Sequence, residues 1–267
     1  DLYKDDTRGL IEFSHHQPLV RALGINNLEL DFKYLRESDR DFLLEYFPNN
    51  YYRYNQPEAL VSARSYADNY HAELLYRTNP QEFDGSPPRS PVEFGSFTDY
   101  EPALTWSYMQ TRMPGGFYLS AEAQAARMRR EFERKVIEQD SYESGRLYGR
   151  AQLERPFRFL GFNWRPYLGL EGAGYDNSRQ RGASIVQWAP EYGIDISTRL
   201  YGEFPGVRND EMGIRGLRHI IEPRLEYAAM DNTSEDPRNV LDFDAHDNLR
   251  GVHVLRLSLD QKFVSGG

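Results

Sequence analysis

Apolar and polar residues alternate along one stretch of the chain that is longer than an ordinary β-strand. Every second position from Phe162 to Gly172 is apolar or small, and the positions between them include Asn163, Arg165 and Glu171. Strands in soluble proteins usually stop after about 5 or 6 residues, whereas a tilted membrane strand needs about 9 to 11. The pattern therefore predicts one strand with two chemically different faces that is long enough to cross a bilayer.

The same alternation recurs in residues 146–154 and 221–229, where charged side chains are confined to alternate positions. An arginine facing lipid at the bilayer midplane costs roughly 2 to 4 kcal/mol, so the charged face must look into a wet lumen. The predicted lumen-facing residues are Arg146, Arg150, Gln152, Glu154, Arg165, Glu222, Arg224 and Glu226. The predicted lipid-facing residues are Leu147, Leu153, Phe162, Trp164, Leu168, Leu170 and Leu225.

The complete pattern predicts on the order of eleven strands separated by turn signals. They lie near residues 8–14, 28–36, 59–66, 70–77, 100–111, 117–133, 145–154, 162–174, 187–201, 216–229 and 252–263. Short links at residues 67–69, 113–116 and 156–161 alternate with long polar links at 78–99, 135–144, 175–183 and 231–250, and residues 202–215 form a link of intermediate length. Short turns on one side and long loops on the other are typical of outer-membrane barrels.

These features predict an all-β fold, an antiparallel up-and-down transmembrane β-barrel that is a partial barrel or a fragment of a larger one. Residues 1–267 are expected to form a single β-barrel segment. Pro102, Pro166 and Pro223 lie inside predicted strands, where proline removes a hydrogen-bond donor, so we expect them to mark bulges. Residues 38–47 are expected to form a capped helical turn.

Composition narrows the functional classes. The chain is 39% hydrophobic and 14% aromatic, with 19 tyrosines, and its mean hydropathy is -0.73. No apolar run approaches the ~18 residues of a transmembrane helix, whereas a barrel needs apolar residues only at alternate positions. The formal net charge of -9 argues against nucleic acid as a partner, because such partners require basic patches. A soluble, tyrosine-rich β-sandwich that binds glycan stays open as an alternative, because its strands alternate too.

Candidate catalytic and metal sites are absent from the sequence pattern. The chain contains no cysteine, and its six histidines show no zinc-type spacing. There is no Gly-x-Ser-x-Gly motif and no phosphate-binding glycine loop. We therefore expect no enzymatic activity, no cofactor and no bound metal.

Four segments resemble one family of membrane proteins. They are residues 38–47, 156–170, 190–198 and 217–227, of which the last is the most specific. These segments look like the C-terminal barrel of the LPS-assembly protein LptD (OstA) family. The resemblance implies a component of the cell outer membrane that inserts lipopolysaccharide into the outer leaflet, passing acyl chains sideways through a seam between strands.

The resemblance also implies partners and a larger barrel. The expected partners are lipopolysaccharide, membrane lipid, a plug lipoprotein like LptE, and the periplasmic proteins that bridge lipopolysaccharide to the barrel through an N-terminal jelly-roll domain. That jelly-roll domain is expected to be absent from this chain. Eleven strands are too few for the family's barrel, whose size is near the roughly 26 strands of large outer-membrane barrels. A generic outer-membrane porin or channel stays open as a further alternative.

Overall fold

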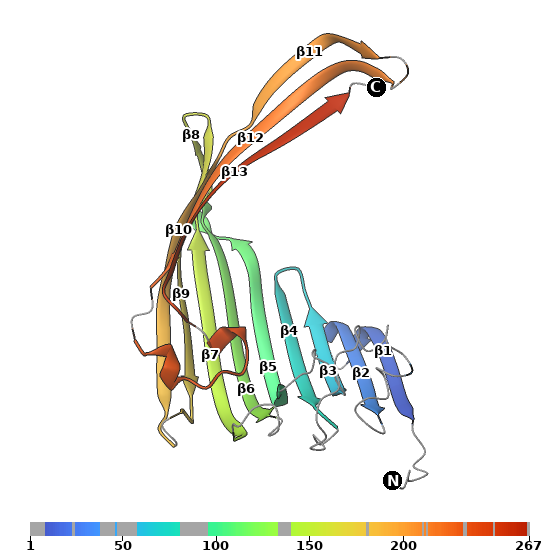
Figure 1. Cartoon of the computed structure of the whole chain (residues 1–267), viewed down its shortest axis with the longest axis vertical. Helices are drawn as coiled ribbons and strands as arrows, with labels where there is room; N and C mark the ends of the chain where they lie inside the picture. The colour runs from blue at the N-terminus through green and yellow to red at the C-terminus, as the bar shows by residue number, and fades with distance from the viewer. Residues whose placement is uncertain are drawn as a thin grey trace, which may run out of the picture.

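The part of the chain described by the computed structural model forms one antiparallel β-sheet (Figure 1). The described residues are 9–22, 25–37, 46, 58–80, 96–132, 140–179, 182–209, 211, 213–231, 234–247 and 249–265. The strands are β1 Leu10–Ala22, β2 Ile25–Glu37, β3 Glu58–Tyr66, β4 Tyr70–Thr78, β5 Ser96–Arg112, β6 Tyr118–Phe132, β7 Tyr142–Glu154, β8 Phe157–Phe159, β9 Phe162–Tyr175, β10 Ile185–Ser197, β11 Leu200–Asn209, β12 Ile214–Met230 and β13 Val252–Ser265. The short 3-10 helices are η1 Pro114–Gly116, η2 Pro237–Asn239 and η3 Ala245–Asp247.

The strands follow one another across the sheet as a meander. The 13 strands occupy eleven positions because two positions hold two strands each. β7 and β8 lie in line along β9, and β10 and β11 lie in line along β12. The edges of the described sheet are β1 and β13, and the sheet is not closed, as expected for a partial barrel. Among the described helices, none has the length and apolar character needed to span a membrane.

The largest difference from the sequence prediction lies in residues 202–215, which were expected to form a link. The structure shows a strand there, β11, paired with the first half of β12. The turn-forming pair Pro205-Gly206 falls where the register shifts between Phe204 and Arg208, so it produces an irregularity within the strand. β1 also continues past its predicted end at Ser14 and includes Pro18. An edge strand tolerates proline because one side of its backbone needs no donor.

Of the three prolines expected to mark bulges, Pro102 does so, and the expectation is wrong for Pro166 and Pro223. Pro102 sits at the register shift between Tyr100 and Ala103, so the predicted bulge is confirmed. Pro166 and Pro223 keep regular register with β10 and β13. On its other side, Pro166 faces the gap between the end of β7 and the start of β8. Pro223 likewise faces the gap between β10 and β11. The missing N–H therefore costs no hydrogen bond to a regular partner strand.

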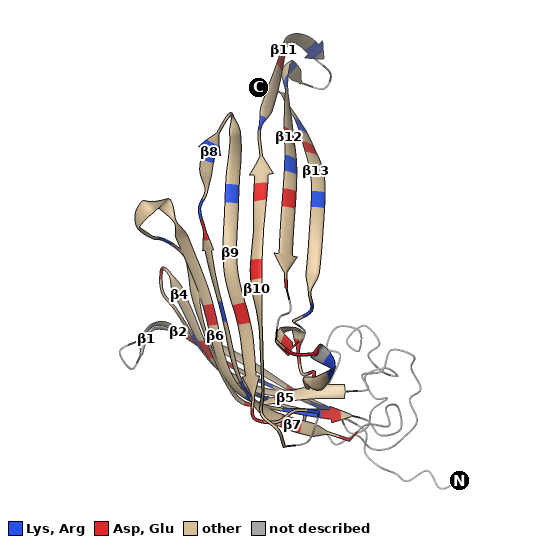
Figure 2. Cartoon of the chain, turned by 90° about the vertical axis from the view of Figure 1, so that its left-hand side faces the viewer, with Lys and Arg blue, Asp and Glu red and all other residues tan. Residues whose placement is uncertain are grey.

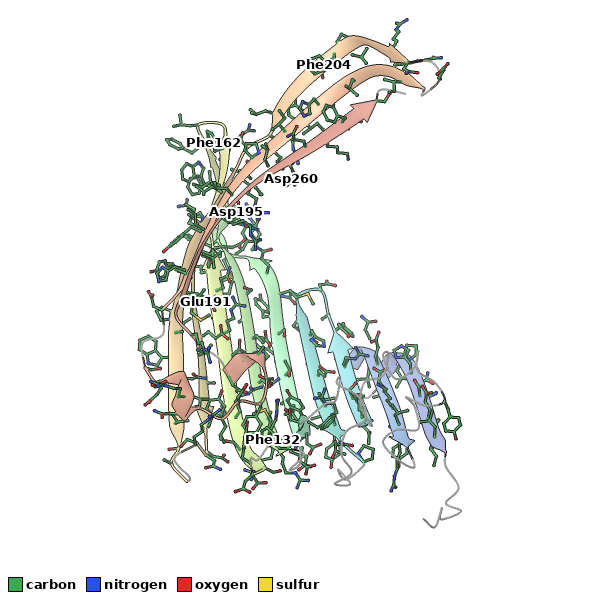
Figure 3. All side chains as sticks on the ribbon, in the orientation of Figure 1. Phe132, Phe162, Glu191, Asp195, Phe204 and Asp260 are labelled. Carbon is green, nitrogen blue, oxygen red and sulfur yellow. The ribbon has the colours of Figure 1, made fainter. Side chains whose placement is uncertain are left out.

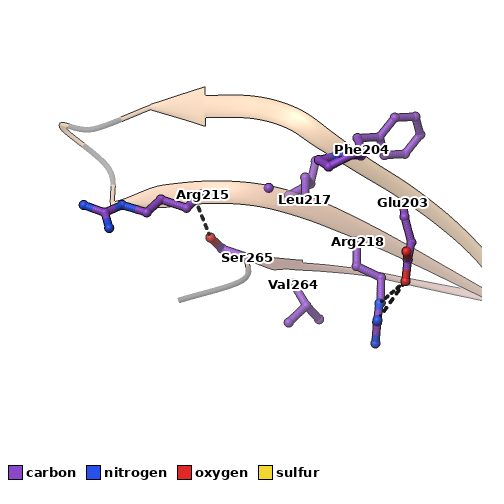
Figure 4. A pocket seen from close by; sticks show the side chains of 9 residues that line it. Glu203, Phe204, Arg215, Leu217, Arg218, Val264 and Ser265 are labelled. Atoms are coloured by element: carbon purple, nitrogen blue, oxygen red, sulfur yellow. Dashed lines mark hydrogen bonds and ion pairs between the residues drawn. The ribbon is translucent and has the colours of Figure 1, made fainter.

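β11, β12 and β13 extend beyond the rest of the sheet and bend away from it (Figure 1). This extension holds a hollow of about 350 Å³ lined by residues of all three strands. In Figure 4, Arg218 pairs with Glu203 at 2.8 Å, and the Arg215 backbone N–H donates to Ser265 at 3.3 Å. The predicted helical turn at residues 38–47 lies outside the described residues, apart from Tyr46.

Candidate functional site

The strand register separates the polar and apolar side chains onto two faces. In the strand register, Arg165 on β9 lies opposite Asp195 on β10, and Asp195 lies opposite Glu226 on β12. The same register places all eight residues predicted to face a lumen on one side of the sheet, and all seven residues predicted to face lipid on the other. Charged residues follow β9, β10, β12 and β13 in Figure 2. The sheet therefore has one polar and one apolar surface, and it curves around the polar one.

The convex face carries large apolar side chains that nothing in the described part of the chain covers. Leu147 is 70% exposed, and Leu168, Leu170 and Leu153 are exposed as well. Trp106 and Trp188, which the sequence pattern did not single out, are also exposed on this side. Both rings lie on the convex face, because the two tryptophans occupy one row across five strands. The register partners in this row are Trp188, Gly172, Gly149, Ala123 and Trp106.

Ion pairs cross the strands of the concave face. Arg165 donates to Asp195 at 2.8 Å, and the Nε of Arg224 donates to the same carboxylate at 3.0 Å. Arg224 also pairs with Glu226 at 2.6 Å. Arg256 reaches the other oxygen of Glu226 at 3.4 Å. The face is thus strongly polar, and its charges are largely compensated by neighbours on adjacent strands.

A second polar group lies nearer the long-loop end of the concave face. Arg150 donates to Glu191 at 2.7 Å and lies 3.9 Å from Glu171. Tyr148 donates its hydroxyl proton to Glu171 at 2.9 Å. Both carboxylates are buried, so these hydrogen bonds replace part of their lost contacts with water.

The loop between β12 and β13 folds onto this concave face. We call the described residues of this loop, 234–247 and 249–250, the strap. In Figure 2 the strap lies on the inner side of the curved sheet. Leu241 and Phe243 pack against Met128 and neighbouring residues, and Val240 packs against Tyr148. All three strap side chains are buried, so the strap encloses a hydrophobic core at the long-loop end of the sheet.

Arg146 binds the strap through its guanidinium group. Its Nη1 donates to Asp244 at 2.7 Å and to Asp247 at 2.6 Å. Its Nη2 donates to Asp244 at 2.6 Å and to Gln124 at 2.5 Å. The Arg146 side chain is 0% exposed. The register places Arg146 on the polar face, whereas nothing in the sequence indicates that the strap shields this arginine from water.

Side chains of the wall also bind the backbone of the strap. Tyr142 donates to the carbonyl of Asp242 at 2.6 Å, and Arg130 donates to that of Phe243 at 2.8 Å. Gln187 donates to the carbonyl of Asp247 at 3.1 Å. Because the strap has no strand partner for these carbonyls, side-chain donors satisfy their need for hydrogen bonds.

The charges around the strap shift the pKa values of two of its residues. A hydrogen bond to Asp244 raises the pKa of His246, with Glu122 adding to the effect, while burial and Arg146 oppose it. Burial disfavours the charged form of Asp244, but hydrogen bonds from His246 and Arg146 outweigh burial and hold the pKa of this carboxyl well below its usual range. The strap is therefore held by a cluster of charged side chains that includes one histidine, His246, whose pKa is raised.

The described residues contain no group of three or more His, Cys, Asp or Glu side chains arranged to hold a metal ion. The strap itself was missed by the sequence analysis, which treated residues 231–250 as a polar link. A local signal exists, because the apolar residues Val240, Leu241 and Phe243 cluster within this otherwise polar segment.

A scan against protein-family models matches residues 6–248 to the family described as LptD, LPS transport system D. The chain belongs to this family. A search of curated proteins finds no match. Membership in the LPS transport family confirms the resemblance seen in the sequence, and the open antiparallel sheet confirms the predicted fold class. The chain is thus a β-barrel protein of the LPS transport family.

Proposed function

We propose that this chain forms part of the barrel wall through which lipopolysaccharide is inserted into the outer leaflet of the cell outer membrane. The observation that carries this proposal is the separation of faces across β7, β9, β10 and β12, with ion pairs on the concave side and exposed leucines on the convex side. An amphiphile with a sugar headgroup and acyl chains needs both environments. The convex face would contact hydrocarbon, and the concave face would contact the sugars.

Within this proposal the wall guides lipopolysaccharide passively. Arg165, Asp195, Arg224 and Glu226 neutralise one another and keep the path hydrated without a strong net field. The strap covers the concave face at the long-loop end, which is the extracellular side in outer-membrane barrels. A plug lipoprotein like LptE, and bridge proteins that deliver lipopolysaccharide from the periplasm, are the partners that the family resemblance supports.

Depletion of the full gene product tests this function. We expect depletion to remove newly made lipopolysaccharide from the cell surface, measured by antibody labelling of intact cells, while total lipopolysaccharide in lysates persists. Re-expression of the unaltered protein should restore the surface signal. An unchanged surface signal after depletion would contradict the proposal.

The two alternatives give different results. A generic porin would alter ion conductance and leave surface lipopolysaccharide unchanged. A soluble glycan-binding sandwich needs two packed sheets, whereas all described strands belong to a single sheet with large apolar side chains exposed on its convex face. The structure therefore contradicts the sandwich alternative.

A further inference from the structure

A second hollow opens on the concave face at the end of the sheet opposite the strap. It has a volume of about 650 Å³ and takes residues from β8, β9, β10, β12 and β13. Register pairs place Arg158, Asn163, Ser197 and Arg224 in one row across four of these strands. Asp195 lies at the bend of the sheet beside this row, and Asp260 lies on β13 further along the extension (Figure 3). We call this feature the turn-side hollow.

The turn-side hollow presents guanidinium groups that retain free donors. Arg165 and Arg224 both donate to the carboxylate of Asp195. Arg224 also forms an ion pair with Glu226. The side chains of Arg165 and Arg224 are 47% and 38% exposed. Each guanidinium has five N–H donors, so a carboxylate partner leaves others available. Arg158 forms no ion pair with any residue of the described part of the chain.

The rest of the lining suits hydroxyl groups. Asn163, Ser197 and Asp260 border the same hollow, and amide, hydroxyl and carboxylate side chains can each hydrogen-bond to a sugar hydroxyl. Glu222 also borders the hollow, but Arg199 neutralises it at 3.0 Å. A ligand that combines an anionic phosphate with several hydroxyls would therefore find a partner for both kinds of group.

The position of the hollow indicates when the ligand would meet it. It lies beside the tight turn at Leu160 and Gly161, and short turns face the periplasm in outer-membrane barrels. The strap closes the concave face at the other end, whereas the turn-side hollow is lined by partly exposed side chains. The concave face is thus accessible from the side at which lipid would arrive.

We propose that the turn-side hollow binds the phosphorylated sugar headgroup of lipopolysaccharide through Arg158, Arg165 and Arg224 as the lipid enters along the concave face. The inference rests on the function proposed above and adds a binding site to it. The planar guanidinium groups form paired hydrogen bonds with phosphate oxygens. Asn163, Ser197 and Asp260 contact the sugar hydroxyls.

Site-specific photocrosslinking in cells tests the site in the full protein with its native partners. A photoreactive amino acid at Asn163 should crosslink to lipopolysaccharide, detected by immunoblot. A second reporter at Gln152 samples the concave face away from the hollow, and a third at Leu168 samples the convex face. Arg158 is the residue to alter, because its removal breaks no ion pair within the described wall.

We expect Arg158→Ala to lower the Asn163 crosslink about tenfold, since a hydrogen bond to a charged group is worth about one decade in an equilibrium constant. Arg158→Lys should lose less, because the charge remains. Arg208→Ala, on the exposed part of β11, is the matched control and should leave the yield unchanged. Cells whose lipopolysaccharide lacks the lipid A phosphates should reproduce the loss seen with Arg158→Ala.

The outcomes separate the site from the function. A strong Asn163 crosslink that neither Arg158→Ala nor loss of the phosphates reduces would overturn phosphate binding in the hollow. A crosslink at Gln152 without one at Asn163 would overturn the hollow as part of the path, while the proposed function stands. The absence of lipopolysaccharide crosslinks at both concave positions would contradict the proposed function itself.

Discussion

Arg146 on β7 and Asp247 in the strap form a buried ion pair with 2.6 Å between Nη1 and Oδ1, although they are 101 residues apart in the sequence. Asp247 also accepts the backbone N–H groups of Phe243 and Asp244 at 2.7 and 2.8 Å. One carboxylate therefore shapes the strap and binds it to the wall.

Replacing Arg146 by Gln should destabilise the protein severely. The change leaves Asp247 buried without its cation and takes Arg146 away from the half-buried Asp244, and removing one partner of a buried pair costs about 3–5 kcal/mol. Arg256→Gln is the matched control, since that side chain is 70% exposed and such pairs contribute about 0–1 kcal/mol. Urea unfolding in lipid vesicles measures the free energy of unfolding for both variants. Equal losses for the two variants would show that the strap pair does not hold the structure.

Strap docking should weaken as pH rises above the ordinary pKa of histidine. The pKa of His246 is raised by Asp244 in the folded protein. The stabilisation is therefore complete below the ordinary histidine pKa of about 6.5 and is lost as pH rises through the folded value. The groups that face His246 are Asp244, Glu122, Arg146 and the ring of Tyr148.

A spin label on Ala245→Cys reports this change. The native chain has no cysteine, so the label is unique, and Ala245 is exposed. We expect the label to be more mobile at pH 8 than at pH 6. His246→Gln should abolish the difference between the two pH values. A mobility that stays constant with pH in the parent chain would refute the role of His246.

An arginine on the convex face should block membrane assembly, whereas one on the concave face should not. Leu153→Arg places a charge in hydrocarbon at a cost of roughly 2 to 4 kcal/mol. Gln152→Arg is the matched control, because adjacent residues of a strand point to opposite faces. Folding into vesicles, followed by the shift of the heat-resistant band on a gel, compares the two. Similar yields for both variants would contradict the assignment of the faces.

Gly193 is expected to tolerate no side chain. A Cβ at this position would lie 2.4 Å from the carbonyl oxygen of Tyr227 and 2.5 Å from the hydroxyl of Tyr167. Since the carbonyl belongs to the paired strand β12, Gly193→Ala must push the strands apart, and overpacking of this kind costs about 1–3 kcal/mol. Gly149→Ala is the control, because its nearest atom would be 3.9 Å away. Thermal unfolding of both variants should show a loss only at Gly193.

Much of the sheet could be predicted from the sequence because strand periodicity is a local property. Side chains alternate between faces whatever the partner strand is, so the positions of Leu153 and Gln152 followed from their order in the chain. The lengths of the apolar alternation and the contrast between short and long links likewise indicated a membrane sheet. Pro102 indicated a bulge for the same reason, since a missing donor disturbs its own strand.

The tertiary structure alone decided the contacts between segments that are far apart in the chain. The sequence order of residues 234–250 indicates a loop, and only the curvature of the wall places Phe243 and Asp247 against β6 and β7. Pro205 reads locally as a turn, yet pairing with β12 keeps its segment in a strand. Local pattern determines which way a side chain points. The burial of Arg146 and the joining of Arg158 to Arg224 in one hollow depend on which distant segments meet, and that information is absent from any short stretch of sequence.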